Sequence, residues 1–85
     1  MCLHQIMSIR VLFFGSTAAI TGKRQIEINL VDESKTGEIL DQLLVDYPKL
    51  AGHRLLLSIN QQYATGEEMV SDGDELAIFT AVSGG

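Results

Sequence analysis

Residues 72–85 read DGDELAIFTAVSGG, and this closing stretch decides how the rest of the chain is interpreted. Its first three residues favour a tight turn, because aspartate and glycine adopt turn conformations readily. From Glu75 to Val82 the side chains alternate between two faces, as they do in a β-strand. One face carries Leu76, Ile78 and Thr80, and the other carries Ala77, Phe79 and Ala81. The stretch therefore predicts a strand that leads directly into Gly84-Gly85.

Two strands and a helix are predicted in residues 8–47. Residues 8–14 are apolar and β-rich, and residues 25–30 alternate cleanly between apolar and polar side chains. A loop between these two segments makes a hairpin with one face available for burial. In residues 36–47 the apolar side chains recur at helical spacing, and Pro48 ends the predicted helix.

The remaining apolar run, residues 55–60, predicts a buried central strand, and residues 62–65 predict a brief edge strand. Without the brief edge strand, the order strand, strand, helix, strand, strand indicates an α+β domain, with one main helix on one face of a mixed sheet. We expect this domain to span residues 8–82. Residues 83–85 are expected to form a flexible tail, and residues 1–7, which fit no periodic pattern, a disordered extension.

The composition is that of one small globular domain. Of the 85 residues, 46% are hydrophobic and 20% are charged, and no apolar run approaches the roughly 20 residues that span a bilayer. Residues 1–7 lack the basic cluster and apolar core of a secretion signal. The net charge of −5, without a basic patch, argues against nucleic acid and anionic membranes as partners. Cys2 has no second cysteine to pair with, which favours a reducing, cytoplasmic location.

The sequence contains no recognisable catalytic set. His4 and His53 are the two histidines, and neither lies beside a plausible nucleophile in the sequence. Cys2 and His4 offer two ligands, fewer than the four of a structural zinc site, so we predict no bound metal. Gly15 and Gly22 lie between two predicted strands and do not form a phosphate-binding loop. We therefore expect a protein without catalytic machinery of its own.

The closing segment Val82, Ser83, Gly84 and Gly85 is the exception. Glycine has no Cβ, so such a tail can enter a narrow channel and approach other backbones closely. Fully extended, the four residues would reach about 14 Å beyond the domain. A terminal carboxylate, with a pKa of roughly 3.5, is ionised and unreactive until it is activated. We predict that Gly85 carries the reactive group and that the three residues before it insert into a partner.

A second candidate region is the face of the sheet away from the predicted helix. Leu12 and Phe14 alternate with the inward residues of the first strand, and Phe79 and Ala81 do so in the last strand. If these two strands pair, Phe14 and Phe79 lie close together beside the tail. Exposed aromatic side chains often anchor protein interfaces. We predict that Leu12, Phe14, Phe79 and Ala81 form an interface with a partner.

Five short motifs carry a specific resemblance. They are VLFFG at residues 11–15, YPKL at 47–50, SIN at 58–60, DGDELAIF at 72–79 and VSGG at 82–85. In this order they resemble the small subunits of molybdopterin synthase, which are sulfur carriers of the ubiquitin-like β-grasp fold. The resemblance covers residues 8–85 and implies that the first and last strands lie parallel in the middle of the sheet. Thr80-Ala81 departs from the proline that is common there, and the lost stiffening predicts a more mobile tail.

The resemblance also implies a mechanism and a set of partners. An E1-like activating enzyme would use ATP to adenylate Gly85, and a sulfur donor protein would convert the adenylate into a thiocarboxylate. The tail would enter the large subunit of molybdopterin synthase, in a heterotetramer, and deliver sulfur to a cyclic pyranopterin precursor of the molybdenum cofactor. The chain itself would hold no permanent cofactor, because the activating enzyme uses the ATP.

Alternative functions share this fold or this tail. One is a sulfur carrier for the thiazole of thiamine or for tRNA thiolation, another is a ubiquitin-like modifier that joins Gly85 to lysines, and a third is an adaptor with an inert tail. The long helix that ends at Tyr47-Pro48 favours the molybdopterin synthase carrier, because thiazole carriers resemble a shorter version of this chain.

Overall fold

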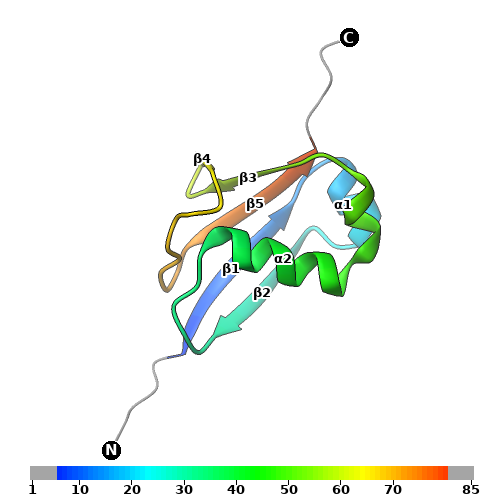
Figure 1. Cartoon of the computed structure of the whole chain (residues 1–85). Helices are drawn as coiled ribbons and strands as arrows, with labels where there is room; N and C mark the ends of the chain where they lie inside the picture. The colour runs from blue at the N-terminus through cyan, green and yellow to red at the C-terminus, as the bar shows by residue number, and fades with distance from the viewer. Residues whose placement is uncertain (1–5, 81–85) are drawn as a thin grey trace, which may run out of the picture.

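A five-stranded sheet and a helix that crosses one of its faces make up most of the fold (Figure 1). The computed structural model describes residues 6–80. The strands are β1 (Met7–Phe13), β2 (Gln25–Leu30), β3 (Leu55–Ile59), β4 (Gln62–Ala64) and β5 (Glu75–Thr80). The helices are α1 (Ser16–Thr21), α2 (Thr36–Asp46) and the 3₁₀ helix η1 (Pro48–Gly52).

The first and last strands are neighbours in the middle of the sheet, whose order is β2-β1-β5-β3-β4. β1 and β5 are parallel, with Val11 opposite Leu76 and Phe13 opposite Ile78, whereas the other pairs are antiparallel. Both strands run towards α1 in Figure 1. The structure therefore confirms the α+β class, the mixed sheet and the parallel central pair.

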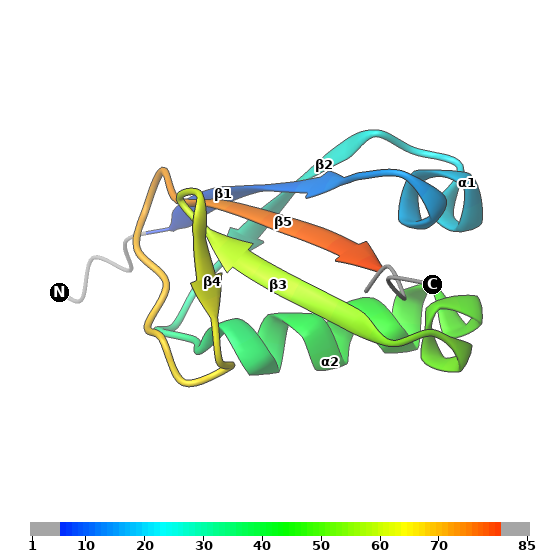
Figure 2. The same ribbon diagram turned by 90° about the horizontal axis from the view of Figure 1, so that it is seen from above.

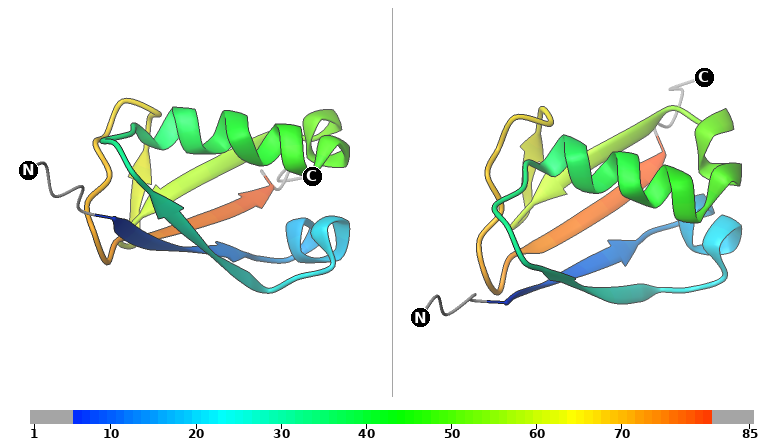
Figure 3. Two further views of the ribbon diagram at one scale, coloured as in Figure 1. Left: turned by 90° about the horizontal axis from the view of Figure 1, so that it is seen from below. Right: turned by 60° about the horizontal axis from the view of Figure 1, so that its bottom comes forward.

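The core lies between the sheet and α2, which crosses the sheet in Figure 3. Its buried residues are Ile9, Val11, Phe13, Ile39, Leu43, Leu57, Val70, Leu76 and Ile78. On each strand these residues have the same parity, so every second side chain points towards α2. Burial of one large aliphatic side chain contributes about 1.5–3 kcal/mol. The position of α2 is therefore set by the apolar stripe of the helix meeting the apolar face of the strands.

The connection between β1 and β2 differs from the predicted loop, because it contains α1. Gly15 and Gly22 flank this helix with φ values of 59° and 75°, a region that glycine enters without a steric penalty. The Gly22 amide caps the helix by donating to Ala18 O at 2.8 Å. A helix of six residues is too short to show a period in the sequence. The same reason explains why the pattern does not predict η1, which follows directly after α2.

The sheet begins slightly earlier than the predicted domain boundary. Met7 pairs with Leu30, so β1 starts one residue before Ser8. The rest of the predicted extension, apart from Ile6, lies outside the described residues, as do residues 81–85 at the other end. None of the helices in the described part of the chain has the length and apolar character needed to cross a bilayer.

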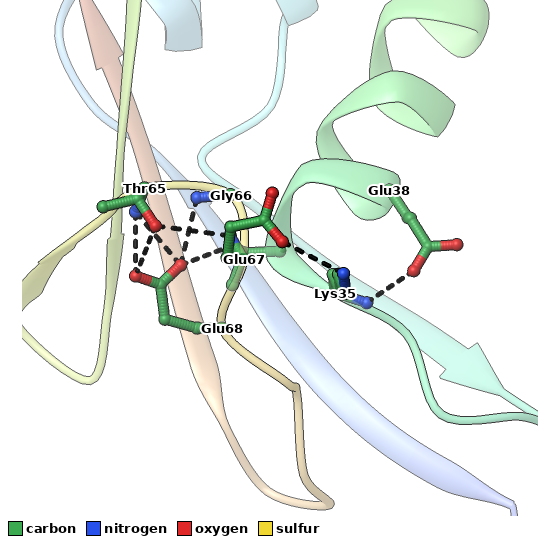
Figure 4. Close-up of polar contacts among 7 residues, drawn as sticks. Lys35, Glu38, Thr65, Gly66, Glu67 and Glu68 are labelled. Carbon is green, nitrogen blue, oxygen red and sulfur yellow. Dashed lines mark hydrogen bonds and ion pairs between the residues drawn. The ribbon is translucent and has the colours of Figure 1, made fainter.

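Glu68 links the segment between β4 and β5 to the start of α2 by hydrogen bonds (Figure 4). The half-buried carboxylate accepts hydrogen bonds from the Thr65 amide at 2.8 Å, the Gly66 amide at 3.0 Å and Thr36 Oγ1 at 2.9 Å. These bonds favour the ionised form, and the backbone bond from Thr65 contributes most. They lower the pKa of Glu68 to about 2. The carboxylate therefore joins two segments that are 32 residues apart in the sequence.

Lys35, the residue before α2, makes two further contacts in the same region (Figure 4). Its amide donates to Glu38 Oε1 at 2.9 Å, and its Nζ lies 3.0 Å from Glu67 Oε2. The hydrogen bond and charge of Glu67 raise the pKa of Lys35. Because both partners of the ion pair are largely exposed, the pair contributes little to stability. The Glu38 contact satisfies an amide at the helix start that would otherwise lack a partner.

Candidate functional site

One face of the sheet, which we call the bare face, is not covered by α2 (Figure 2). The registers of β1, β5, β3 and β4 place alternate side chains on it. These residues are Arg10, Leu12, Leu56, Ser58, Tyr63, Glu75, Ala77 and Phe79. The bare face divides into an apolar half near the end of β5 and a charged half near its start.

The apolar half is built by paired residues of three neighbouring strands. Leu12 of β1 lies opposite Ala77 of β5, and Leu56 of β3 lies opposite Phe79 of β5. Leu12, Leu56 and Phe79 are only partly buried although they are large and apolar. A contiguous apolar surface that is rimmed by polar residues is typical of an interaction site.

Tyr63 of β4 extends the apolar half towards the edge of the sheet. Its ring centroid lies 6.1 Å from that of Phe79, with the planes at 52°, a separation typical of attractive aromatic pairs. Its side chain is nevertheless 77% exposed. Together with Ser58 and Gln61, the two rings line a shallow recess of about 250 Å³. This recess is suited to a side chain from a partner rather than to a small substrate, which usually needs a deeper cavity.

The charged half consists of side chains at the start of β1 and β5. Arg10 lies opposite Glu27 of β2 on one side and Glu75 of β5 on the other. The Arg10 Nη1 atom is 3.7 Å from Glu75 Oε2, and the Arg10 side chain is 59% exposed. An exposed pair of this kind adds little stability, but it sets the polar boundary of the apolar half.

The end of β5, residues 78–80, is the point from which the closing segment continues, and we call it the tail root. The Phe14 amide donates to Ile78 O at 3.1 Å, which is the last main-chain bond from the β1 side among residues 6–80. Thr17 of α1 is fully buried, and its hydroxyl lies 2.8 Å from Ile78 O and 2.7 Å from Phe14 O. The single hydroxyl proton of Thr17 can be donated to either carbonyl, and each carbonyl also accepts from a main-chain amide, Ile78 O from Phe14 and Phe14 O from Thr17. The buried polar groups of the tail root are therefore satisfied.

The described residues offer little for catalysis. Their His, Cys, Asp and Glu side chains form no group of three that could hold a metal ion. Glu68, whose pKa is strongly lowered, is occupied by hydrogen bonds to its own loop and to Thr36. The described residues present an exposed apolar surface and end at the root of the closing segment.

Comparison with known proteins agrees with this arrangement. The profile of the ThiS family matches residues 11–85. The chain belongs to the ThiS family. A relative from Arabidopsis thaliana, named molybdopterin synthase sulfur carrier subunit, is 33% identical over 81 residues, which cover 93% of this chain and 84% of the relative.

Two solved structures share the fold of this ThiS-family chain. SAMP1 from Haloferax volcanii has a TM-score of 0.79 and 27% identity, covering 92% of this chain and 99% of its own. The ubiquitin of Caldiarchaeum subterraneum has a TM-score of 0.65 and 20% identity, covering 95% of this chain and 100% of its own. The fold of this ThiS-family chain is therefore the ubiquitin-like β-grasp, as the resemblance implied.

The structure places three of the four predicted interface residues of this ThiS-family chain. Leu12 and Phe79 lie on the bare face, and Phe14 follows β1 with its side chain 50% exposed. The aromatic contact of Phe79 is with Tyr63, which the interface prediction does not include. Ala81 lies outside the described residues.

The predicted tail residues, Val82, Ser83, Gly84 and Gly85, also lie outside the described residues, so their roles stay predictions. Tyr63 and Leu56 are the large side chains of the apolar half that are not among the predicted interface residues. The alternation of residues 55–60 and 62–65 could have placed both of them on the outer side, but only the sheet order brings them beside Phe79.

Proposed function

We propose that this ThiS-family chain is the sulfur carrier subunit of molybdopterin synthase. It delivers sulfur, as a thiocarboxylate on Gly85, to the cyclic pyranopterin precursor in molybdenum cofactor biosynthesis. The observation that carries the proposal is the course of β5, which ends beside the apolar half of the bare face and continues in sequence as AVSGG. The names of relatives such as the one from Arabidopsis thaliana support the proposal.

The proposed chemistry takes place on the carboxylate of Gly85. The carboxylate attacks the α-phosphorus of ATP in an E1-like activating enzyme, releasing pyrophosphate and forming an acyl adenylate. The persulfide of a sulfur donor protein displaces AMP, and a second thiol then frees the thiocarboxylate while a disulfide forms on the donor. The thiocarboxylate is a good nucleophile, whereas the carboxylate is a poor one. No cofactor is held permanently by the carrier.

The proposed assembly divides the work between two proteins. The large synthase subunit supplies the basic and general acid groups and the pocket for the pterin. The carrier supplies the tail, with Val82, Ser83 and Gly84 inside the pocket, and the bare face as its docking surface. We propose a heterotetramer in the cytoplasm, where the lone Cys2 would remain reduced.

Deletion of Gly85 is the decisive experiment. The proposal expects the variant to fold like the wild type, because Gly85 has no side chain to bury and follows the last strand in the sequence, yet to be inactive. Losing one residue retracts the carboxylate by about 3.5 Å, and a misplacement of about 1 Å can cost about a hundredfold in rate. Intact mass, measured first on the purified protein, establishes that Gly85 carries the terminal carboxylate.

The reconstituted assay contains the activating enzyme, ATP, the sulfur donor and the large subunit. The wild type should gain the mass of one sulfur in place of one oxygen and then form the dithiolene product, whereas the deletion variant should do neither. The variant Gly84→Ala, which keeps the length of the tail, is expected to fold normally and to act slowly if the channel is narrow. Full activity of the deletion variant would contradict the sulfur-carrier function and favour the alternative, an adaptor with an inert tail.

A ubiquitin-like modifier is the second candidate, because SAMP1, the small archaeal modifier protein 1 of Haloferax volcanii, is 27% identical. Incubation with an extract of the source cells separates the two functions. A carrier exchanges oxygen for sulfur at its C-terminus, whereas a modifier forms isopeptide-linked ladders with other proteins. Carriers for the thiazole of thiamine or for tRNA thiolation would gain sulfur too, but would not support dithiolene formation with the large synthase subunit.

A further inference from the structure

The side of β5 that pairs with β1 loses its strand neighbour before β5 ends. The register of the two strands stops at Phe13 and Ile78, and β3 continues to pair with β5 as far as Thr80 on the other side. The last residues of β5 therefore have a strand on one side only. A strand end that is bonded on one side is prone to fraying, because few bonds have to open.

A hydroxyl pair joins α1 to this strand end. Ser16 Oγ, in the first turn of α1, lies 2.8 Å from Thr80 Oγ1, and either hydroxyl can donate. The two residues are 64 positions apart in the sequence. Thr80 is the last described residue before the closing segment, so among residues 6–80 this hydroxyl pair is the side-chain hydrogen bond nearest to that segment.

We propose that the Ser16–Thr80 hydroxyl pair is a positioning latch that holds the tail root and thereby sets the point from which the reactive tail leaves the domain. The pair takes the place of the main-chain bonds that β1 no longer supplies beyond Ile78. This inference rests on the proposed function only where it concerns the rate at which the partner enzymes act on Gly85. The latch itself is a property of the free protein and can be tested without any partner.

The latch has a defined consequence for catalysis by the partner enzymes. When the pair is broken, the strand end frays, and more residues must be ordered each time the tail enters an active site. Ordering backbone residues costs conformational entropy, and this cost falls on the step that places the carboxylate rather than on docking of the body. The bare face is unchanged, so Ser16 and Thr80 should affect the maximal rate more than the affinity.

Four variants of the full chain test the latch. Thr80→Val removes the hydroxyl and keeps the branched shape, and Ser16→Ala removes the other partner. Thr80→Ser keeps the hydroxyl and should therefore restore the latch. Thr21→Val is the matched control, because it removes a hydroxyl from the same helix that bonds to Thr17 O and Lys23 O and not to β5.

The first measurement is ¹⁵N relaxation of the Ala81 and Val82 amides in the free protein. We expect faster local motion in Thr80→Val and in Ser16→Ala than in the wild type. A variant that combines these two exchanges should show no further increase. Thr80→Ser and Thr21→Val should match the wild type. The latch would be overturned if Thr80→Val and the wild type showed the same relaxation. It would also be overturned if Thr80→Ser increased the local motion as much as Thr80→Val does.

The second measurement is pyrophosphate release from ATP by the purified E1-like enzyme. One hydrogen bond of typical net strength predicts a kcat that is about threefold to tenfold lower in Thr80→Val and Ser16→Ala, with KM for the carrier within about twofold of the wild-type value. An unchanged kcat in both variants would contradict the positioning role. If the wild type itself is not adenylated, the proposed function fails, and the relaxation measurements alone decide whether the latch exists.

Discussion

At the scale of single residues, a glycine pair sets how closely α2 approaches the segment after β4. The Gly37 amide in the first turn of α2 donates to Gly66 O at 2.9 Å. A Cβ at Gly37 would lie 3.0 Å from the same oxygen, closer than ordinary contacts allow. Gly66 has a φ of +104°, a conformation that residues with a side chain rarely adopt. The local requirement for glycine therefore comes from a contact between two distant segments.

The exchange Gly37→Ala is predicted to destabilise the protein. Gly66 cannot move away freely, because its oxygen accepts from Gly37 and its amide is held by Glu68. Strain from overpacking, about 1–3 kcal/mol, should exceed the helix propensity gained from alanine, at most about 1 kcal/mol. Urea unfolding should show a net loss of about 1 kcal/mol. The control Gly52→Ala enters open space and should be neutral, so equal stability of the two variants would contradict the prediction.

At the scale of elements, Glu68 joins the β4–β5 segment to α2, and this connection depends on pH. A carboxyl whose pKa is lowered on folding stabilises the folded state at every pH where it is ionised in both states. For Glu68 this holds above about 4.5, its ordinary value. The stabilisation is lost as the pH falls through about 2, the pKa in the folded protein. Acid should therefore weaken the contact between these two elements.

The exchange Glu68→Gln tests this connection, because glutamine has the same shape without the charge. The variant is expected to unfold at a lower temperature than the wild type at pH 7. The difference between the two proteins should shrink as the pH is lowered from about 4.5 to 2, since the wild-type carboxyl then becomes neutral as well. Calorimetry across this range measures it, with Glu33→Gln, an exposed carboxylate before α2, as the control. A difference that does not depend on pH would contradict the charge-based explanation.

At the scale of the whole molecule, the parallel pair of β1 and β5 sets the position of the proposed docking surface and of the tail root. The α2 helix occupies one face of the sheet, and the opposite face is the docking surface that we propose (Figure 3). The parallel course of β1 and β5 brings the end of β5 to α1, which holds the tail root. The apolar half of the bare face lies at this same end, because Phe79 is one residue before the end of β5. We therefore expect docking and tail placement to be coupled through β5.

Docking through the bare face predicts a binding defect for Tyr63→Ala. Tyr63 is highly exposed, so its removal should leave the fold intact, whereas Phe79 is partly buried and its removal would also affect stability. Aromatic residues at interface centres commonly contribute about 1–2 kcal/mol or more, which corresponds to about tenfold in Kd. Isothermal titration calorimetry with the large synthase subunit measures this change.

The matched control is Val45→Ala on α2, which removes a side chain that is 71% exposed and lies on the other side of the molecule. It should bind like the wild type. If Tyr63→Ala bound with wild-type affinity and Val45→Ala bound more weakly, the interface would lie on α2 and not on the bare face.

The features that have a local period could be predicted from the amino-acid sequence alone. The alternation of residues 25–30 gives β2 one apolar face, and the helical spacing gives α2 one apolar stripe, because each of these two elements buries one side. The contacts between residues that are distant in the chain could not be predicted in this way and became known only from the fold. Ser16 and Thr80, Thr36 and Glu68, and Tyr63 and Phe79 lie far apart in the chain, and no local pattern records their contacts. The physical reason is that such contacts depend on the order and register of the strands, which long-range pairing sets.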